Sequence, residues 1–257
     1  MTSRIIVFGA LFVSMVGVPS VANATDYHHI HLVASSRAEA KQWYMTHMEC
    51  TDYGRPDACQ IGNTFIIFFE RDPSGPSVGS GVDHIGFSFT NLAEKMASLE
   101  DAGVKILEPI REISGLFKLA FIEDPWGTKI EIVEDHEWLG FHHIHLRSAE
   151  PAVTLSWYAD IFGGTRDSLK GRIGGLRYGT VWLLVARHDG ELAPTQGRAF
   201  DHLGWKFPDL RAEAENIKRK GVQFDIEPRP FTNPIGEEML ISFVTGPDGV
   251  RIEIVQH

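Results

Sequence analysis

Residues 27–32 read YHHIHL and residues 141–146 read FHHIHL, so one histidine-rich segment occurs twice, 114 positions apart. Within each copy the histidines at the third and fifth positions alternate with Ile and Leu. Strict alternation is typical of a β-strand that turns one face to an apolar core and the other away from it. Each copy therefore predicts a strand with two histidines on its second face.

Other parts of the sequence repeat in the same order. Three further pairs of segments match: WY at 43–44 and 157–158, VDHIGF at 82–87 and FDHLGW at 200–205, and DPWGTKIEIV at 124–133 and GPDGVRIEIV at 246–255. Their offsets of 114, 118 and 122 positions differ only by loop-sized insertions. Such self-similarity indicates two copies of one domain, which we place at residues 25–136 and 140–257.

Each half divides again into two similar quarters. A strand precedes a predicted helix at 36–48, and the pattern restarts at 84–89 before a helix at 92–102. In the second half the corresponding helices are predicted at 153–162 and 210–220, and a glycine follows or closely follows each helix except the first. Segments rich in Gly, Pro and Ser at 72–81 and Gly-containing residues at 190–197 link the quarters. The sequence therefore predicts an α+β fold of four β-α-β-β-β modules, with open, barrel-like sheets and helices outside.

Strand parity places the same chemistry on one face in both halves. In the first half the face opposite the apolar one carries His29, His31, His84 and Glu131. In the second half it carries His143, His145, His202 and Glu253. These residue types suit a divalent metal site in a concave, wet cavity. The remaining histidines of the two repeats, His28 and His142, have the opposite parity and are predicted to be structural.

Four such modules, each half with a histidine at the start of its first and second strand sets and a DPxGxxxE-like closing strand, resemble the vicinal oxygen chelate superfamily. This group includes glyoxalase I, fosfomycin-resistance proteins, methylmalonyl-CoA epimerase, extradiol dioxygenases and the metal-free bleomycin-binding proteins. The resemblance covers essentially all of the chain after residue 24. It implies the fold, whereas one fold hosts many reactions.

The resemblance also implies a set of metal ligands. Isomerase-type members have a further ligand at the end of their first module, and the matching positions here, Ile67 and its repeat Leu183, cannot bind a metal. Two histidines and one carboxylate with open positions remain, which is typical of non-haem Fe(II) enzymes, so Fe²⁺ is favoured, with Zn²⁺ or Mn²⁺ as alternatives. The implied ligands, taken half by half, are His29, His84 and Glu131, then His143, His202 and Glu253.

Two questions about these residues stay open from the sequence. The quarters that share an ion are not determined, because His29 could join His202 and Glu253 in place of its neighbours in the first half. His31 and His145 either contact substrate or ligands as catalytic residues, or only line the cavity.

The reaction is narrowed by two departures from the family. Extradiol enzymes carry a tyrosine where this chain has Phe121 and Phe243, and a histidine that is absent from 113–118 and 233–240. This argues against catechol cleavage of the standard kind. We expect an oxygenase or a lyase/isomerase that acts on a small, vicinally oxygenated molecule. The alternative is a metal-free binding protein, similar to bleomycin-resistance proteins, that sequesters an aromatic or cationic compound.

The N-terminus predicts export. Arg4 precedes an apolar run at 5–18, and ANA at 22–24 offers a cleavage site after Ala24. Residues 1–24 are therefore predicted to be a signal peptide, with a secreted or periplasmic mature protein that leaves the membrane. In an oxidising compartment Cys50 and Cys59 could form a disulfide or remain thiols.

Composition limits the partners. The formal net charge of −10 disfavours binding to the phosphate backbone of nucleic acids. The expected partner is a small-molecule substrate, and the expected state is a monomer or a homodimer.

Overall fold

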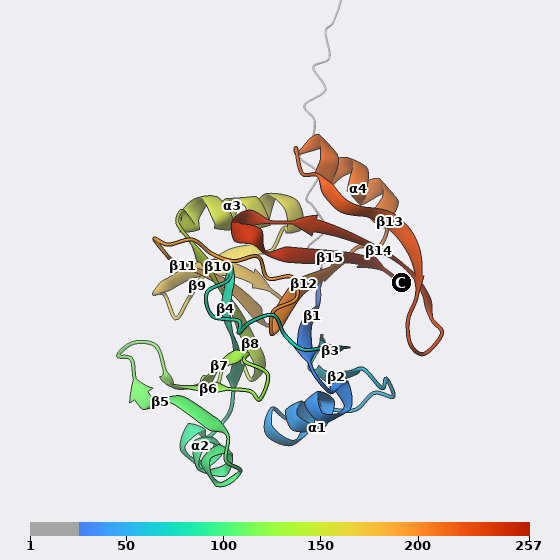
Figure 1. Ribbon diagram of the computed structural model, residues 1–257. Coiled ribbons are helices and arrows are strands. Elements are labelled where there is room, and N and C mark those ends of the chain that lie inside the picture. The colour runs from blue at the N-terminus through green and yellow to red at the C-terminus, as the bar shows by residue number, and fades with distance from the viewer. Residues whose placement is uncertain (1–25) are drawn as a thin grey trace, which may run out of the picture.

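The computed structural model describes residues 26–257, so the predicted signal peptide lies outside the described residues. These residues form two β-sheets, of seven and eight strands, with four α-helices packed around them (Figure 1). This confirms the predicted α+β class of paired open sheets. Between residues 26 and 257, no helix combines the length and the apolar character that a membrane span requires.

The quarters follow one another with similar elements. The first quarter contains β1 (Asp26–Ala34), α1 (Arg37–His47), β2 (Ala58–Ile61) and β3 (Thr64–Glu70). The second contains β4 (Val82–Ser88), α2 (Leu92–Asp101), β5 (Lys105–Glu112), β6 (Lys118–Glu123) and β7 (Lys129–Glu134). The third contains β8 (Gly140–Ser148), α3 (Pro151–Phe162), β9 (Thr165–Leu169), β10 (Ile173–Tyr178) and β11 (Val181–Arg187). The fourth contains β12 (Phe200–Lys206), α4 (Leu210–Arg219), β13 (Phe224–Thr232), β14 (Glu238–Thr245), a 3-10 turn (Pro247–Gly249) and β15 (Arg251–Gln256).

The first quarter is one strand shorter than predicted. Where the third quarter has β9, the first has a single bridge between Thr51 and Gln60. Residues 49–57 contain Gly54 at φ 91° and a proline, which favour turns over a strand. A disulfide between Cys50 and Cys59 ties this segment to β2 and answers the question that the sequence left open.

Local signals explain where the helices begin. Ser36, Asn91 and Asp209 each accept a hydrogen bond from the backbone N–H three residues later, at 3.0–3.3 Å. Such caps satisfy amide groups that the first helical turn leaves free. The helix α3 begins instead with Pro151, whose fixed φ suits the first helical position.

Each of the two sheets contains strands from both halves of the sequence. The seven-stranded sheet has the order β13-β14-β15-β12-β1-β3-β2, and the eight-stranded sheet has the order β5-β6-β7-β4-β8-β11-β10-β9. The first quarter, blue in Figure 1, thus lies beside the last, orange to red, because β1 pairs antiparallel with β12. The second and third quarters are joined in the same way by β4 and β8. Each repeated half therefore contributes to both sheets.

One continuous core joins the two sheets and includes side chains of α1 and α3. The ring of Tyr44 on α1 lies 5.4 Å from Phe68 in one sheet and 6.4 Å from Phe87 in the other. On α3, Phe162 stacks on Trp205 at 4.3 Å between ring centroids. Because these helices contact both sheets, the two halves form one packed unit.

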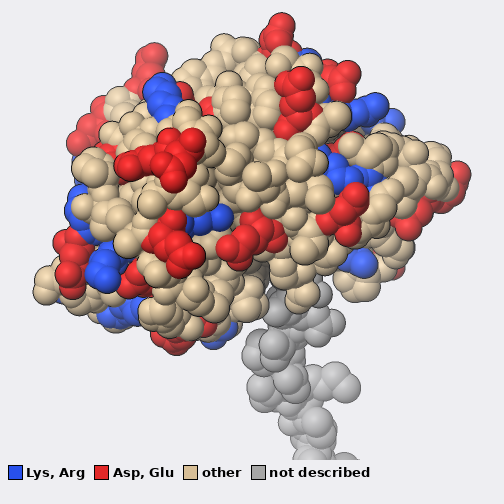
Figure 2. Space-filling view, turned by 90° about the horizontal axis from the view of Figure 1, so that it is seen from below, with Lys and Arg blue, Asp and Glu red and all other residues tan. Residues whose placement is uncertain are grey.

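Charges of both signs share the surface. On the face in Figure 2, Lys and Arg side chains are interspersed with Asp and Glu, and no continuous basic patch is visible on that face.

Candidate metal centres

The sheets bring the eight side chains of the predicted cavity faces into two groups. Each group offers nitrogen and carboxylate oxygen atoms that all lie within 4.8 Å of one another. The first centre, on the seven-stranded sheet, consists of His29, His31, His202 and Glu253. The second centre, on the eight-stranded sheet, consists of His84, Glu131, His143 and His145.

This grouping corrects the half-by-half arrangement of ligands. His29 does not join His84 and Glu131, because β1 pairs with β12 and β12 pairs with β15. The alternative across the two halves is the correct one. The physical reason is that the crossing strands β1 and β12 have the same pattern as β4 and β8, so sequence alone does not select their partners.

In the first centre one carboxylate oxygen faces two imidazoles. Oε2 of Glu253 lies 2.9 Å from Nε2 of His29 and 3.1 Å from Nε2 of His202. Nε2 of His31 is farther away, at 3.9 Å from the same oxygen. All four side chains are buried. Burial makes an unpaired charge costly, so these groups need each other or a cation.

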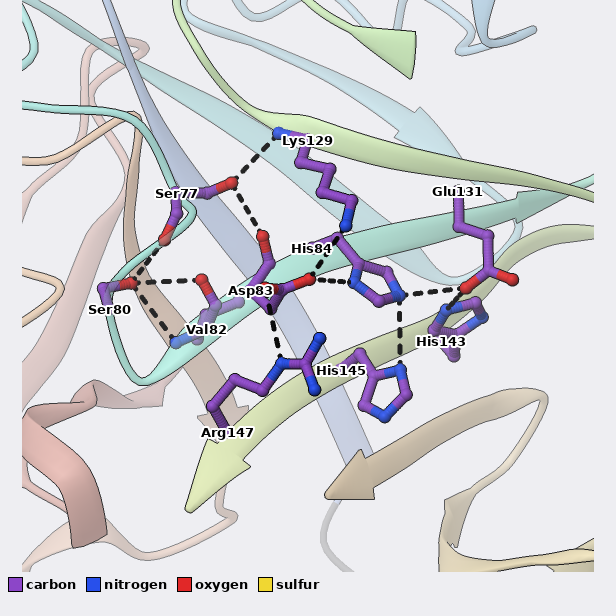
Figure 3. Close-up of polar contacts among 10 residues, drawn as sticks. All are labelled: Ser77, Ser80, Val82, Asp83, His84, Lys129, Glu131, His143, His145 and Arg147. Carbon is purple, nitrogen blue, oxygen red and sulfur yellow. Dashed lines mark hydrogen bonds and ion pairs between the residues drawn. The ribbon is translucent and has the colours of Figure 1, made fainter. Parts of the chain in front are cut away.

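The second centre repeats this geometry, as Figure 3 shows. Oε2 of Glu131 lies 2.9 Å from Nε2 of His84 and 3.1 Å from Nε2 of His143. Nδ1 of His145 is 3.2 Å from Nε2 of His84. Four side chains from β4, β7 and β8 thus point at one location.

An aspartate controls the outer nitrogen of one histidine in each centre. Nδ1 of His84 donates to Asp83 at 2.6 Å, and Nδ1 of His202 donates to Asp201 at 2.5 Å. A proton fixed on Nδ1 leaves the lone pair of Nε2 directed into the centre. Both aspartates are extra residues at irregularities of the β-ladder, since the register shifts between Val82 and His84, and opposite His31 and Leu32.

A second chain of contacts orients His143. Its Nδ1 lies 2.8 Å from Nδ1 of His142, whose Nε2 faces Asp135 at 3.4 Å. If the Nε2–H group of His142 donates to Asp135, Nδ1 of His142 accepts a hydrogen bond from the Nδ1–H group of His143. The Nε2 lone pair of His143 is then free to face into the centre. Lys170 in turn contacts Asp135 at 2.7 Å.

The first centre also has a contact between two neighbouring histidines, but His257 takes the place of the aspartate behind them. Nδ1 of His28 lies 2.7 Å from Nδ1 of His29, and the ring of His28 lies 5.0 Å from the ring of His257. His257 stands in the second half of the chain at the position, counted along the repeat, that Asp135 occupies in the first half. The two centres therefore share their inner ligands and differ behind them.

The parity assigned to His28 and His142 was wrong, because each lies against the histidine that follows it. The register shifts between Tyr27 and His29, and between Phe141 and His143, so each of these histidines is the extra residue of a β-bulge. A bulge turns two successive side chains toward the same side and breaks the alternation on which parity rests. The HH pair preceding Ile was the available sequence signal.

Within each centre the pKa values of the ionisable side chains are shifted in different directions. Burial alone would raise the pKa of Glu131, but hydrogen bonds with His143 and His84 lower it well below its usual range. Burial lowers the pKa of His84, and its bonds with Asp83 and Glu131 outweigh that effect and raise it. Burial lowers the pKa of His143 to about 4. In the first centre the pKa of His202 is raised and that of Glu253 is lowered, as for His84 and Glu131 in the second. Burial lowers the pKa of His29.

These donors fit a divalent cation. The outward N–H groups of His84 and His143 are engaged, so their two Nε2 lone pairs and the carboxylate of Glu131 converge as acceptors. Hydrogen-bond acceptors do not stabilise one another. Protonation of one imidazole would turn only one of these acceptor–acceptor contacts into a hydrogen bond. A divalent ion would satisfy all of them, and two imidazoles with one carboxylate are ordinary ligands for Zn, Fe or Mn.

Apolar residues lie at the positions expected for the further isomerase ligand, with one shift in position. Ile67 lies opposite His31 in the β1–β3 register, and Leu184 lies opposite His145 in the β8–β11 register. The repeat of Ile67 is therefore Leu184. Leu183, which the sequence suggested, lies opposite Ile144 and packs into the core.

A cavity opens beside each centre. The first, of about 370 Å³, is lined by His31, Glu253 and side chains of β3, β13 and β14. The second, of about 260 Å³, is lined by all four residues of the second centre and by Phe117, Leu119 and Leu184. Phe121 and Phe243, which replace the extradiol tyrosine, line one cavity each. These volumes suit small organic molecules.

Comparisons with known proteins agree with this architecture. Residues 140–254 match the model of the Glyoxalase/Bleomycin resistance protein/Dioxygenase superfamily. The third and fourth quarters carry this match, and the first two quarters repeat their motifs and share their sheets. This second half of the chain belongs to the superfamily.

Solved structures of similar fold cover nearly the whole chain. Glyoxalase I from Zea mays has 17% sequence identity and a TM-score of 0.71, covering 90% of this chain and 92% of its own. A putative dioxygenase from Bacillus subtilis has 18% identity and a TM-score of 0.66, covering 91% of this chain and 86% of its own. A search of curated proteins gave no match. At these identities the likeness shows the fold alone.

Proposed function

We propose that this protein is a metal-dependent enzyme that acts on a small molecule with two adjacent oxygen atoms, as an oxygenase or as a lyase/isomerase. One observation carries the proposal: in each centre two imidazole lone pairs and a buried carboxylate converge, while their outward N–H groups are bonded. When bound, a divalent ion would act as a Lewis acid on oxygen atoms that reach its open positions.

Different residues of the chain would hold the ion and orient the imidazoles that bind it. Glu253 with His29 and His202, and Glu131 with His84 and His143, would hold the ion. Asp201, Asp83 and the His142–Asp135 pair keep the imidazoles oriented.

His31 and His145 are proposed to contact substrate. Burial lowers the pKa of both well below the usual range, so both are neutral near pH 7. His31 lines the cavity, and its Nδ1 has no hydrogen-bond partner among the described residues. A neutral imidazole beside an ion-bound substrate is placed to accept a proton from it.

We further propose that the mature protein works outside the cytoplasm, after cleavage following Ala24. The signal-like residues 1–24 motivate this, and the Cys50–Cys59 disulfide supports an oxidising compartment. N-terminal sequencing of the protein from cell fractions tests it. Recovery of an uncleaved chain in the cytosol would contradict export.

Metal analysis followed by reconstitution tests the enzymatic proposal. The protein is stripped of metal and reloaded separately with Fe(II), Mn(II), Ni(II) and Zn(II), and bound metal is measured. Each form is then offered catechols, hydroquinones and α-hydroxyketones while oxygen is monitored. Oxygen uptake with Fe(II) or Mn(II) identifies an oxygenase, and turnover with Zn(II) or Ni(II) without oxygen identifies a lyase or isomerase. Failure of every ion to bind would leave a binding protein as the better description.

A further inference from the structure

The basic side chains that line the two cavities are nearly all paired. In the first cavity Arg37 contacts Glu70 at 3.4 Å, Arg55 contacts Asp57 at 2.7 Å, and Arg251 contacts Asp201 at 3.0 Å. In the second cavity Lys129 and Arg147 share Asp83, each at 3.4 Å, and Arg111 contacts Glu108 at 3.3 Å. Only Arg229 of the first cavity lacks a carboxylate partner among residues 26–257.

The repeat shows why Arg229 is unpaired. In the β13–β14 ladder Ile226 lies opposite Phe243 and Arg229 lies opposite Ile241. In the β5–β6 ladder Glu108 lies opposite Phe121 and Arg111 lies opposite Leu119. Since Phe121 and Phe243 are equivalent, Ile226 stands in the place of Glu108. The first cavity thus keeps the arginine of the second and replaces its acidic partner with an apolar side chain.

Apolar and aromatic side chains line part of the cavity that Arg229 also lines. Phe69, Phe231, Ile241 and Phe243 line the same cavity, and His31 stacks on Phe69 at 4.2 Å. A free guanidinium beside such side chains recognises a carboxylate, which it binds through two parallel N–H donors. The apolar walls accept the body of the molecule.

We infer that the first cavity binds an anionic small molecule, an aromatic or apolar carboxylate with two adjacent oxygens, whose carboxylate pairs with Arg229, while the second cavity favours neutral molecules. This rests on the proposed function for the adjacent oxygens, which would face the ion. The two centres of one chain then serve different substrates.

The test compares one pair of probes at the two centres. Glu131→Gln silences the second centre and Glu253→Gln the first, and each variant is loaded with Zn(II), which undergoes no redox reaction. Calorimetry measures the affinity for catechol and for 3,4-dihydroxybenzoate, and the ratio of the two is compared between centres. We expect the ratio to favour the carboxylate about tenfold more at the first centre, as for one charged hydrogen bond near solvent.

Variants of the arginine and its neighbour assign the effect. Arg229→Gln should abolish the preference and leave catechol binding unchanged, and the matched Arg111→Gln should change little. Ile226→Glu should also abolish it, whereas Glu108→Ile should create it at the second centre. Equal ratios at the two centres, or a ratio that survives Arg229→Gln, would overturn the inference.

A metal-free arm separates this inference from the proposed function. Benzoate and benzamide need no ion, so their binding to the metal-free protein is followed by NMR with and without Arg229→Gln. A benzoate preference that depends on Arg229 supports the inference even if no metal binds. Equal binding of benzoate and benzamide would count against it even if both centres hold metal.

Discussion

The imidazole of His29 on β1 occupies the space that a side chain on Gly204 of β12 would need. The two residues face each other across the β1–β12 ladder, and a methyl group at Gly204 would collide with the Cε1, Nδ1 and Nε2 atoms of His29. Gly86 and His143 stand in the same relationship between β4 and β8. Neither glycine has a positive φ, so space for the ring, and not backbone freedom, requires glycine here.

The first prediction follows from this contact. Gly204→Ala should push the His29 ring away from Glu253 and weaken metal binding at the first centre at least about tenfold, with a loss of roughly 1–3 kcal/mol in stability from overpacking. Titration of the metal-free variant with Zn(II) and thermal unfolding measure both effects. Gly174→Ala is the control, since nothing lies within 4 Å of its added methyl group. Unchanged affinity in Gly204→Ala would contradict the assignment of His29 as a ligand.

The second prediction concerns which residues share an ion. Replacing His29 and Glu253 together by Ala and Gln should leave one ion per chain, because both belong to the first centre. Replacing His29 and Glu131 should impair both centres and leave none tightly bound. Metal analysis after gel filtration separates the outcomes. One ion remaining in the second double variant and none in the first would restore the half-by-half arrangement.

Sequence patterns predicted which side chains share the cavity face, because parity and repetition are local properties. His29, His31, Glu131 and their repeats alternate with buried Ile and Leu, and each faces the cavity side as expected. The pairing of the quarters was not predictable in this way. Both arrangements place the same strand types side by side, and only the long-range choice between β12 and β4 as the neighbour of β1 distinguishes them.

The groups behind the ligands were missed for a different reason. Asp83, Asp201, His28 and His142 each precede a ligand histidine by one residue, and strict alternation assigns them to the opposite face. Bulges bring them beside the ligand that follows. A bulge depends on the partner strand as much as on its own sequence, so a single strand pattern does not reveal it.

The third prediction separates ligand from substrate contact for His31 and His145. His31→Gln should leave Zn(II) affinity within about threefold, because Nε2 of His31 lies 3.9 Å from Glu253, beyond the 2.9–3.1 Å of the other two histidines. Turnover at the first centre should fall by about 10²-fold or more, mainly in kcat, as expected for loss of a general base. A Co(II) absorption spectrum unchanged by the substitution would confirm that the coordination sphere is intact. A large loss of metal affinity would instead identify His31 as a fourth ligand.

The last prediction concerns protons released when metal binds. In the metal-free second centre the pKa of His84 is raised, whereas that of His143 is lowered to about 4 and that of Glu131 lies well below its usual range. Below the raised pKa of His84 the centre therefore holds one displaceable proton, on that imidazole, and His202 plays the same part in the first centre. Each ion should displace about one proton, and affinity should fall as the pH drops below the raised pKa of these histidines.

Calorimetry in buffers of different ionisation enthalpy counts these protons. Asp83→Asn removes the charged hydrogen bond at Nδ1 that raises the pKa of His84, so release of the Nε2 proton should be lost there and fall from about two protons per chain to about one, and metal affinity at the second centre should fall roughly 10–100-fold. The same proton also stabilises the metal-free fold. Because the folded pKa of His84 is raised, that stabilisation is present below the ordinary pKa of about 6.5 and is lost as pH rises through the folded value. The metal-free wild type should thus lose more stability than Asp83→Asn between those two pH values. Binding without proton release would show that the histidines are already neutral and would contradict the role given to Asp83.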